Sequence, residues 1–185
     1  MPVKFGFDNP LLKTWLLIHQ TYNLVLRCED AVFAKEGLTT EHHSVLMAIK
    51  FIGSQATVTD VARWLDRKAN TISLLADRME KRGLLRRARD LRDRRLVRLV
   101  MTTEGEEVFE RATIAGWELV QQMLSSLSEK EQLVLSDLLE VVRQRAFEYL
   151  SPGETMEEIQ VDERRNMARF MLAIRRHKAR ASGAD

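Results

Sequence analysis

Residues 56–83 read ATVTDVARWLDRKANTISLLADRMEKRG and contain two short apolar series with helical spacing, separated by a polar turn. The first series predicts a short helix with Thr59 as its N-cap and Asp60 at its positive end. The turn falls near residues 66–68, and the second series predicts a helix over about 69–82. The two faces of this second helix differ: Ile72, Leu75, Ala76 and Met79 would face a core, whereas Asn70, Thr71, Ser73, Leu74, Arg78 and Lys81 would face outward.

After Gly83 the hydrophobic period changes from 3.6 to 2. The segments LLRRAR (84–89) and RLVRLVMT (95–102) predict two β-strands. Between them lies a charged loop, DLRDR (90–94), whose only apolar residue is Leu91. Two short helices around a tight turn, followed by a basic hairpin, are the order of a winged helix-turn-helix.

The rest of the chain is predicted to be helical. Of its 185 residues, 45% are apolar and 30% are charged, and residues 11–151 contain no proline. Helical spacing of apolar residues predicts further helices at about 10–35, 41–52, 103–127 and 128–150, and Ser128 with Glu131 forms a capping-box pattern. The fold class is therefore mainly α with a small β-hairpin wing, a winged helix-turn-helix lobe joined to a helical region.

Positive charge is concentrated in the predicted lobe. The formal net charge of the chain is +2, yet residues 63–98 hold thirteen Lys and Arg against five acids. The remainder is acidic. A basic block inside an acidic chain is typical of a protein that presents one face to a polyanion.

Several classes of protein are excluded or disfavoured. The single cysteine, Cys28, excludes a disulfide framework and a CxxC-type zinc module. The chain lacks a Gly-rich phosphate loop, an HExxH motif and a nucleophile elbow, so we expect neither an enzyme nor a cofactor. The longest uncharged stretch, residues 14–26, is shorter than the roughly 20 residues of a membrane span. We therefore expect a cytoplasmic protein with no membrane partner.

The motifs of the chain resemble those of the MarR family of transcription regulators. The resemblance rests on LTTEHHSVLMAI (38–49), on VTDVARWLDRKANTISLLADRMEKRGLL (58–85), on DLRDRRLVRLVMTTEG (90–105) and on LSEKE (127–131). It covers roughly residues 10–150. It implies a homodimer that binds a pseudo-palindromic operator in double-stranded DNA and acts as a repressor. The predicted helix at 10–35, apolar on two faces, independently requires a burial partner.

The resemblance also implies a division of the chain by role. We expect a dimerisation helix in residues 1–36, the DNA-binding lobe in 37–102 and two further dimerisation helices in 103–150. Residues 151–185 would form an extension with an extra helix and a flexible tail, packing on the partner subunit through Phe170, Met171 and Ile174.

Candidate DNA contacts follow from the positions that match the family pattern. A recognition helix reads base edges with short polar side chains and arginine, and a wing places arginine in the minor groove. The base-reading positions match Asn70, Thr71, Ser73 and Arg78, the phosphate-facing turn matches Arg67 and Lys68, and the wing matches Arg92, Arg94 and Arg95, with Asp93 bracing Arg95. The alternative is that these charged residues form a solvated surface. A winged helix that contacts only proteins would lack this polar and arginine-rich set.

An effector site is a further expectation of the resemblance, because family members commonly release DNA when a small aromatic or anionic molecule binds. The candidate lining residues are Trp15, His19, Tyr22, His42, His43 and Trp117, for which core packing is the alternative. Redox sensing by Cys28 is disfavoured by its acidic neighbours. Zinc sensing is suggested by the Glu41-His42-His43 run and His19, but the helix at 103–127 contains no histidine to complete four ligands, so we expect no metal site.

Overall fold

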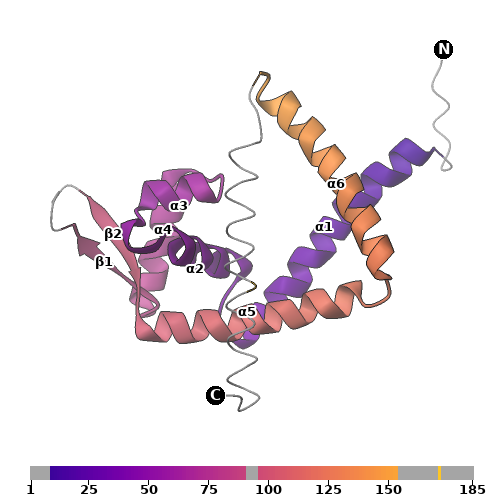
Figure 1. Cartoon of the computed structure of the whole chain (residues 1–185). Helices are drawn as coiled ribbons and strands as arrows, with labels where there is room; N and C mark the ends of the chain where they lie inside the picture. Colours follow the sequence, from indigo (N-terminus) through magenta and orange to yellow (C-terminus); the bar gives the residue numbers. More distant parts are fainter. Residues whose placement is uncertain (1–8, 91–95, 154–170, 172–185) are drawn as a thin grey trace. The chain divides into compact units, whose positions relative to one another are not determined.

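A computed structural model of the chain describes residues 9–90, 96–153 and 171. The elements are α1 (Pro10–Lys35), α2 (Thr40–Ile52), the 3-10 turn η1 (Gly53–Gln55), α3 (Val58–Trp64), α4 (Ala69–Lys81), β1 (Leu85–Arg89), β2 (Val97–Met101), α5 (Thr103–Leu124) and α6 (Glu129–Leu150) (Figure 1). This order confirms the mainly α class with a β-hairpin wing. The chain divides within α5 into two compact units, Met1–Leu119 and Val120–Asp185, and the division by role stays a prediction.

Side-chain caps fix where the short helices begin. Thr57, not Thr59, is the N-cap of α3: its hydroxyl accepts the N–H of Asp60 at 3.2 Å, and Asp60 Oδ2 accepts the N–H of Thr57 at 3.1 Å. The expectation of Thr59 was wrong because a capping box needs its acid three residues after the cap. The predicted box of Ser128 and Glu131 at the start of α6 is confirmed.

The turn between α3 and α4 lies where the spacing predicts it. Asp66 adopts a left-handed backbone with φ 50°, and the N–H of Arg67 bonds to the carbonyl of Ala62 at 2.9 Å. This geometry reverses the chain within a few residues. At the other end of α4, Gly83 adopts φ 74° and leads directly into β1.

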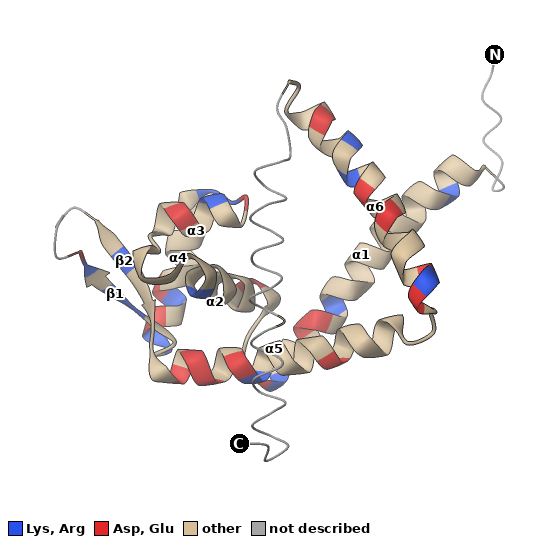
Figure 2. Cartoon of the chain, in the orientation of Figure 1, with Lys and Arg blue, Asp and Glu red and all other residues tan. Residues whose placement is uncertain are grey.

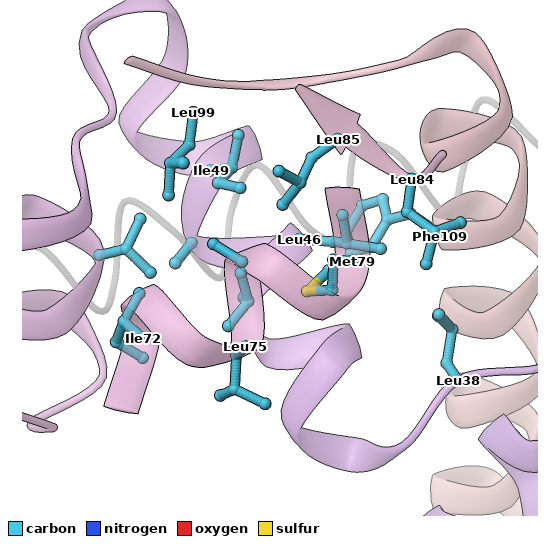
Figure 3. Close-up of a cluster of buried hydrophobic side chains, with 14 of the residues drawn as sticks. Leu38, Leu46, Ile49, Ile72, Leu75, Met79, Leu84, Leu85, Leu99 and Phe109 are labelled. Carbon is cyan, nitrogen blue, oxygen red and sulfur yellow. The ribbon is translucent and has the colours of Figure 1, made fainter. Parts of the chain in front are cut away.

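The core of the first unit joins the lobe helices to the hairpin. The predicted inner face of α4, namely Ile72, Leu75, Ala76 and Met79, is buried. Leu46 of α2, Leu85 of β1 and Leu99 of β2 are fully buried in the same cluster (Figure 3). Phe33 of α1 and Phe109 of α5 extend this core, so these two helices are anchored on the lobe.

The hairpin is attached to the lobe by backbone as well as side chains. β1 and β2 pair antiparallel, with Arg87 opposite Leu99. The N–H of Leu99 also bonds to the carbonyl of Ala56 at 2.8 Å, and Thr57 bridges to Arg98. The residues just before α3 therefore continue the sheet, which holds the base of the wing against the helices.

Two helices expose large apolar faces. On α1, Leu11, Trp15 and Leu24 are more than half exposed, and α6 has no buried residue at all within the described structure. Leu138 of α6, for example, is 60% exposed. Despite these faces, no helix among the described residues has the length and the apolar run that crossing a membrane requires.

Candidate nucleic-acid interface

The outward face of α4 is accessible and carries polar side chains around exposed Leu74. Asn70, Thr71 and Arg78 are exposed, and among the described residues their side chains make no hydrogen bond or ion pair. Ser73, also a predicted contact, is half-buried. Three predicted base-reading residues thus lie on one accessible helix face.

The turn before α4 presents two cations beside a helix N-terminus. Arg67 and Lys68 are both exposed, and Lys68 is the N-cap of α4 without a side-chain cap. The first amide groups of a helix carry partial positive charge and bind anions. The structure therefore brings together the predicted phosphate-facing residues and an end of α4 suited to phosphate.

Arg87 fixes the position of α4 relative to the hairpin. Its guanidinium lies 2.6 Å from Asp77 Oδ1 and 2.9 Å from Glu80 Oε2, and it donates to the carbonyl of Ser73 at 3.2 Å. The N–H of Arg87 donates to Glu80 Oε1 at 2.7 Å, and these hydrogen bonds hold the pKa of Glu80 below its usual range. The Arg87 side chain is only 24% exposed. Its contacts with Asp77, Glu80 and Ser73 therefore fix the angle between α4 and the β1–β2 hairpin.

Two further arginines of the basic block have structural partners. Arg98 of β2 binds Asp90 Oδ2 at 2.8 Å and donates to the carbonyl of Gln55. Arg82 donates to the carbonyl of Gly37. Sequence reasoning counted Arg82, Arg87 and Arg98 only as positive charge. The period of two could have indicated Arg87, because it shares a strand face with buried Leu85.

The tip of the wing carries the remaining predicted contacts. Arg92, Asp93, Arg94 and Arg95 lie outside the described residues, so their roles stay predictions. The structure describes both ends of this loop. The N–H of Asp90 bonds to the carbonyl of Leu96 at 3.0 Å and closes the hairpin there. Figure 2 colours the charged residues on the ribbon, with acidic residues at the start of α5, where Glu104 and Glu106 lie in the first turn.

His42 and His43 are buried in the first unit. The ring of His43 stacks between Phe33 and Phe109, with centroid distances of 4.3 Å and 5.2 Å, and its Nε2 lies 3.0 Å from Thr113 Oγ1. Burial lowers the pKa of His43 to about 4. The Nδ1 of His42 accepts the N–H of Thr39 at 3.3 Å, and burial, with Arg82, lowers its pKa. His43 therefore packs in the core, and His42 caps the start of α2.

The other effector candidates are Tyr22, Trp15, His19 and Trp117. Tyr22 lines a cavity of about 480 Å³ between α1, α2 and the α3–α4 turn, and it is the one effector candidate of the six that does. Trp15 and His19 form an edge-to-face pair on exposed α1, with ring centroids 4.6 Å apart. Trp117 is half-buried in α5. Within the described ranges, no group of three His, Cys, Asp or Glu is placed to hold a metal ion.

Comparisons with known proteins match the sequence and the fold of this chain. A family model described as the MarR family matches residues 36–96. The HTH-type transcriptional repressor MdtR of Bacillus subtilis (strain 168) is 30% identical over 135 residues, which are 73% of this chain and 78% of MdtR. The name of this relative describes a transcriptional repressor.

Solved structures share the fold. The organohalide-sensing regulator RdhR in its ligand-free form has a TM-score of 0.69 at 24% identity, covering 83% of this chain and 90% of that chain. A mutant of MarR from E. coli in complex with operator DNA has a TM-score of 0.65 at 22% identity, covering 74% of this chain and 98% of that chain. Both share the winged-helix fold described above.

Proposed function

The chain belongs to the MarR family of DNA-binding transcriptional regulators, and on this premise we propose that it is a homodimeric repressor of a pseudo-palindromic operator. A small-molecule effector releases it from DNA. The repressor role is supported by the relative MdtR, which is itself named a repressor. The observation that carries the DNA-binding surface is the exposed set of Asn70, Thr71 and Arg78 on one face of α4, whose side chains have no partner among the described residues.

The roles of the contacts follow from their chemistry. Asn70 and Arg78 offer amide and guanidinium groups that can make paired hydrogen bonds to base edges in the major groove. Arg67 and Lys68 serve phosphates beside the N-terminus of α4. Arg95 enters the minor groove with Asp93 bracing it, and Arg92 and Arg94 serve the backbone. The operator-bound MarR structure supports this docking mode for the fold.

Homodimer formation is supported by the apolar faces that the chain leaves exposed. Leu11 is 80% exposed on α1, and Leu133, Leu138 and Leu150 are all more than half exposed on α6. Soluble proteins rarely expose contiguous apolar patches of this kind unless a partner covers them. A second copy of the chain is the partner that a two-fold symmetric operator requires.

The test of DNA reading is an in vitro selected duplex titrated against the Arg78→Ala variant by fluorescence anisotropy. We expect a loss of about 1–3 kcal/mol in binding free energy, because the variant removes one base-edge contact. Arg145→Ala is the matched control, since Arg145 is an exposed arginine of α6 that only pairs with Glu148. Equal affinity of wild type and Arg78→Ala would contradict the assigned role of α4.

A further inference from the structure

The cavity between α1, α2 and the α3–α4 turn has the size of a small-molecule site. Its volume of about 480 Å³ falls within the range of roughly 300–1,000 Å³ that holds drug-sized ligands. Tyr22, Leu26 and Glu29 follow one another at four and three residues along α1, so they lie on one face of the helix and line the cavity together. This wall offers an aromatic ring, an aliphatic side chain and a carboxylate.

The other walls combine apolar with polar side chains, and the apolar part is rigid. Val45 comes from α2, Leu65 from the end of α3, and Ile72 and Leu75 from α4. Val45, Ile72 and Leu75 are buried members of the lobe core, so their positions are fixed by packing on their other sides. An apolar ligand body would be removed from water by packing against half-buried Leu26 and Leu65, which these core residues support.

The charge of the cavity wall is negative. Glu29, Asp30 and Glu41 contribute three carboxylates, against the single guanidinium of Arg67. Asp30 already has partners, since it accepts the N–H of Thr40 at 2.9 Å and the hydroxyl of Thr40 at 2.7 Å. An anionic ligand would meet three like charges here.

Glu29 and Glu41 are the cavity carboxylates that make no hydrogen bond or ion pair among the described residues, and Glu29 is the more buried of the two. The position of Glu29 is therefore decisive. Its side chain is half-buried in the cavity wall. Burial and the neighbouring charge of Asp30 raise the pKa of Glu29 above its usual range. A partly desolvated carboxylate gains most from a cation brought beside it.

We propose that this cavity binds a small organic cation with an apolar body, with the Glu29 carboxylate as its counter-ion and the Tyr22 ring against its charged group. Aromatic faces attract ammonium groups, so Tyr22 and Glu29 favour the same ligand charge. This ligand class differs from the aromatic or anionic effector that the sequence resemblance implies. The inference rests on the proposed function in taking the cavity as the effector site, because Arg67 and Thr71 line it and are also predicted DNA contacts.

The experiment compares three probes that share one apolar body and differ only in head group: 4-phenylbutylamine, 4-phenylbutanol and 4-phenylbutyrate. Each is titrated by calorimetry into the full-length protein without DNA, at neutral pH. We expect the ammonium form to bind roughly tenfold tighter than the alcohol, and the carboxylate to bind weakest. Backbone amide shifts in two-dimensional NMR should move at Tyr22, Thr40 and Leu65.

Glu29→Gln keeps the shape of the side chain and removes its charge, so it should abolish the preference for the ammonium probe. Glu118→Gln is the control, because Glu118 is an exposed carboxylate of α5 outside the cavity lining. Absence of binding, equal affinity for the three probes, or an unchanged preference in Glu29→Gln would overturn the proposal. Since no DNA is present, such a result leaves the operator-binding test on Arg78→Ala unaffected.

Discussion

The winged lobe and the exposed helices differ in how far their apolar residues are buried. The lobe buries Leu46, Ile72 and Met79 completely inside one chain. By contrast, α6 buries none of its residues, although it carries Leu133 and Leu138. The lobe is therefore stabilised by its own core, whereas α6 needs a surface supplied from elsewhere. A mutation in the lobe should act on folding, and a mutation on α6 should act on association.

The largest expected effect is on the lobe core. Leu46→Ala should lower the free energy of unfolding by about 2–5 kcal/mol, because it removes a fully buried side chain and leaves a cavity. Urea denaturation followed by circular dichroism measures this loss. Leu74→Ala is the control, since Leu74 is exposed on α4 and should cost far less. Equal losses in the two variants would break the assignment of Leu46 to the core.

The buried His43 should make the stability of the lobe depend on pH. Its pKa is about 4 in the folded state and about 6.5 in the unfolded chain, so the unfolded state binds the proton more readily. Full stability is present above about pH 6.5 and falls as the pH drops toward 4, by about 3 kcal/mol in all. Denaturation at several pH values checks this.

The histidine variants separate His43 from other titrating groups. His43→Gln should remove most of this pH dependence, whereas His19→Gln should retain it because His19 is exposed on α1. Wild-type pH dependence in His43→Gln would mean that another group causes it.

A charged residue placed on the exposed apolar face of α6 should weaken dimer formation. Leu138→Glu should weaken the dimer by about 1.5–3 kcal/mol for each copy of the side chain, because it removes apolar area that the partner buries. Analytical ultracentrifugation over a range of concentrations measures the dissociation constant. Ser136→Glu adds the same charge to α6 on another face, so we expect it to leave the constant nearly unchanged. A Leu138→Glu dimer of wild-type affinity would contradict a role for this face.

The smallest expected effect concerns the ion pairs that Arg87 makes between the β1–β2 hairpin and α4. Arg87→Met keeps much of the side-chain volume and removes the ion pairs to Asp77 and Glu80. We expect about tenfold weaker operator binding, since α4 and the wing lose their fixed angle. Arg86→Met is the control, because Arg86 is exposed on the opposite face of β1. Unchanged affinity in Arg87→Met would show that the network serves stability alone.

Local patterns in the sequence predicted the elements and their buried faces well. The inner face of α4 follows from spacing alone, because apolar residues at helical intervals must share one side. The capping box of Ser128 and Glu131 is likewise a contact between residues three apart. The expectation of Thr59 as the N-cap of α3 was wrong, because Thr57 is the threonine that has an acid three residues later.

Long-range contacts could not be predicted from the same patterns. Arg87 donates to the carbonyl of Ser73, fourteen residues away in the sequence. Arg98 donates to the carbonyl of Gln55, forty-three residues away. A count of positive charge does not distinguish such arginines from those left free for DNA. The burial of His43 between Phe33 and Phe109 likewise depends on how three helices meet, which no local spacing contains.

The most direct test of the account is a hydroxyl-radical footprint of the full-length protein on its selected operator. A dimer that presents two α4 helices to successive major grooves should protect two half-sites whose centres lie about 10–10.5 base pairs apart. Additional protection of the flanking minor groove would mark the wings. A single protected half-site, or protection without that spacing, would contradict the paired DNA-reading lobes.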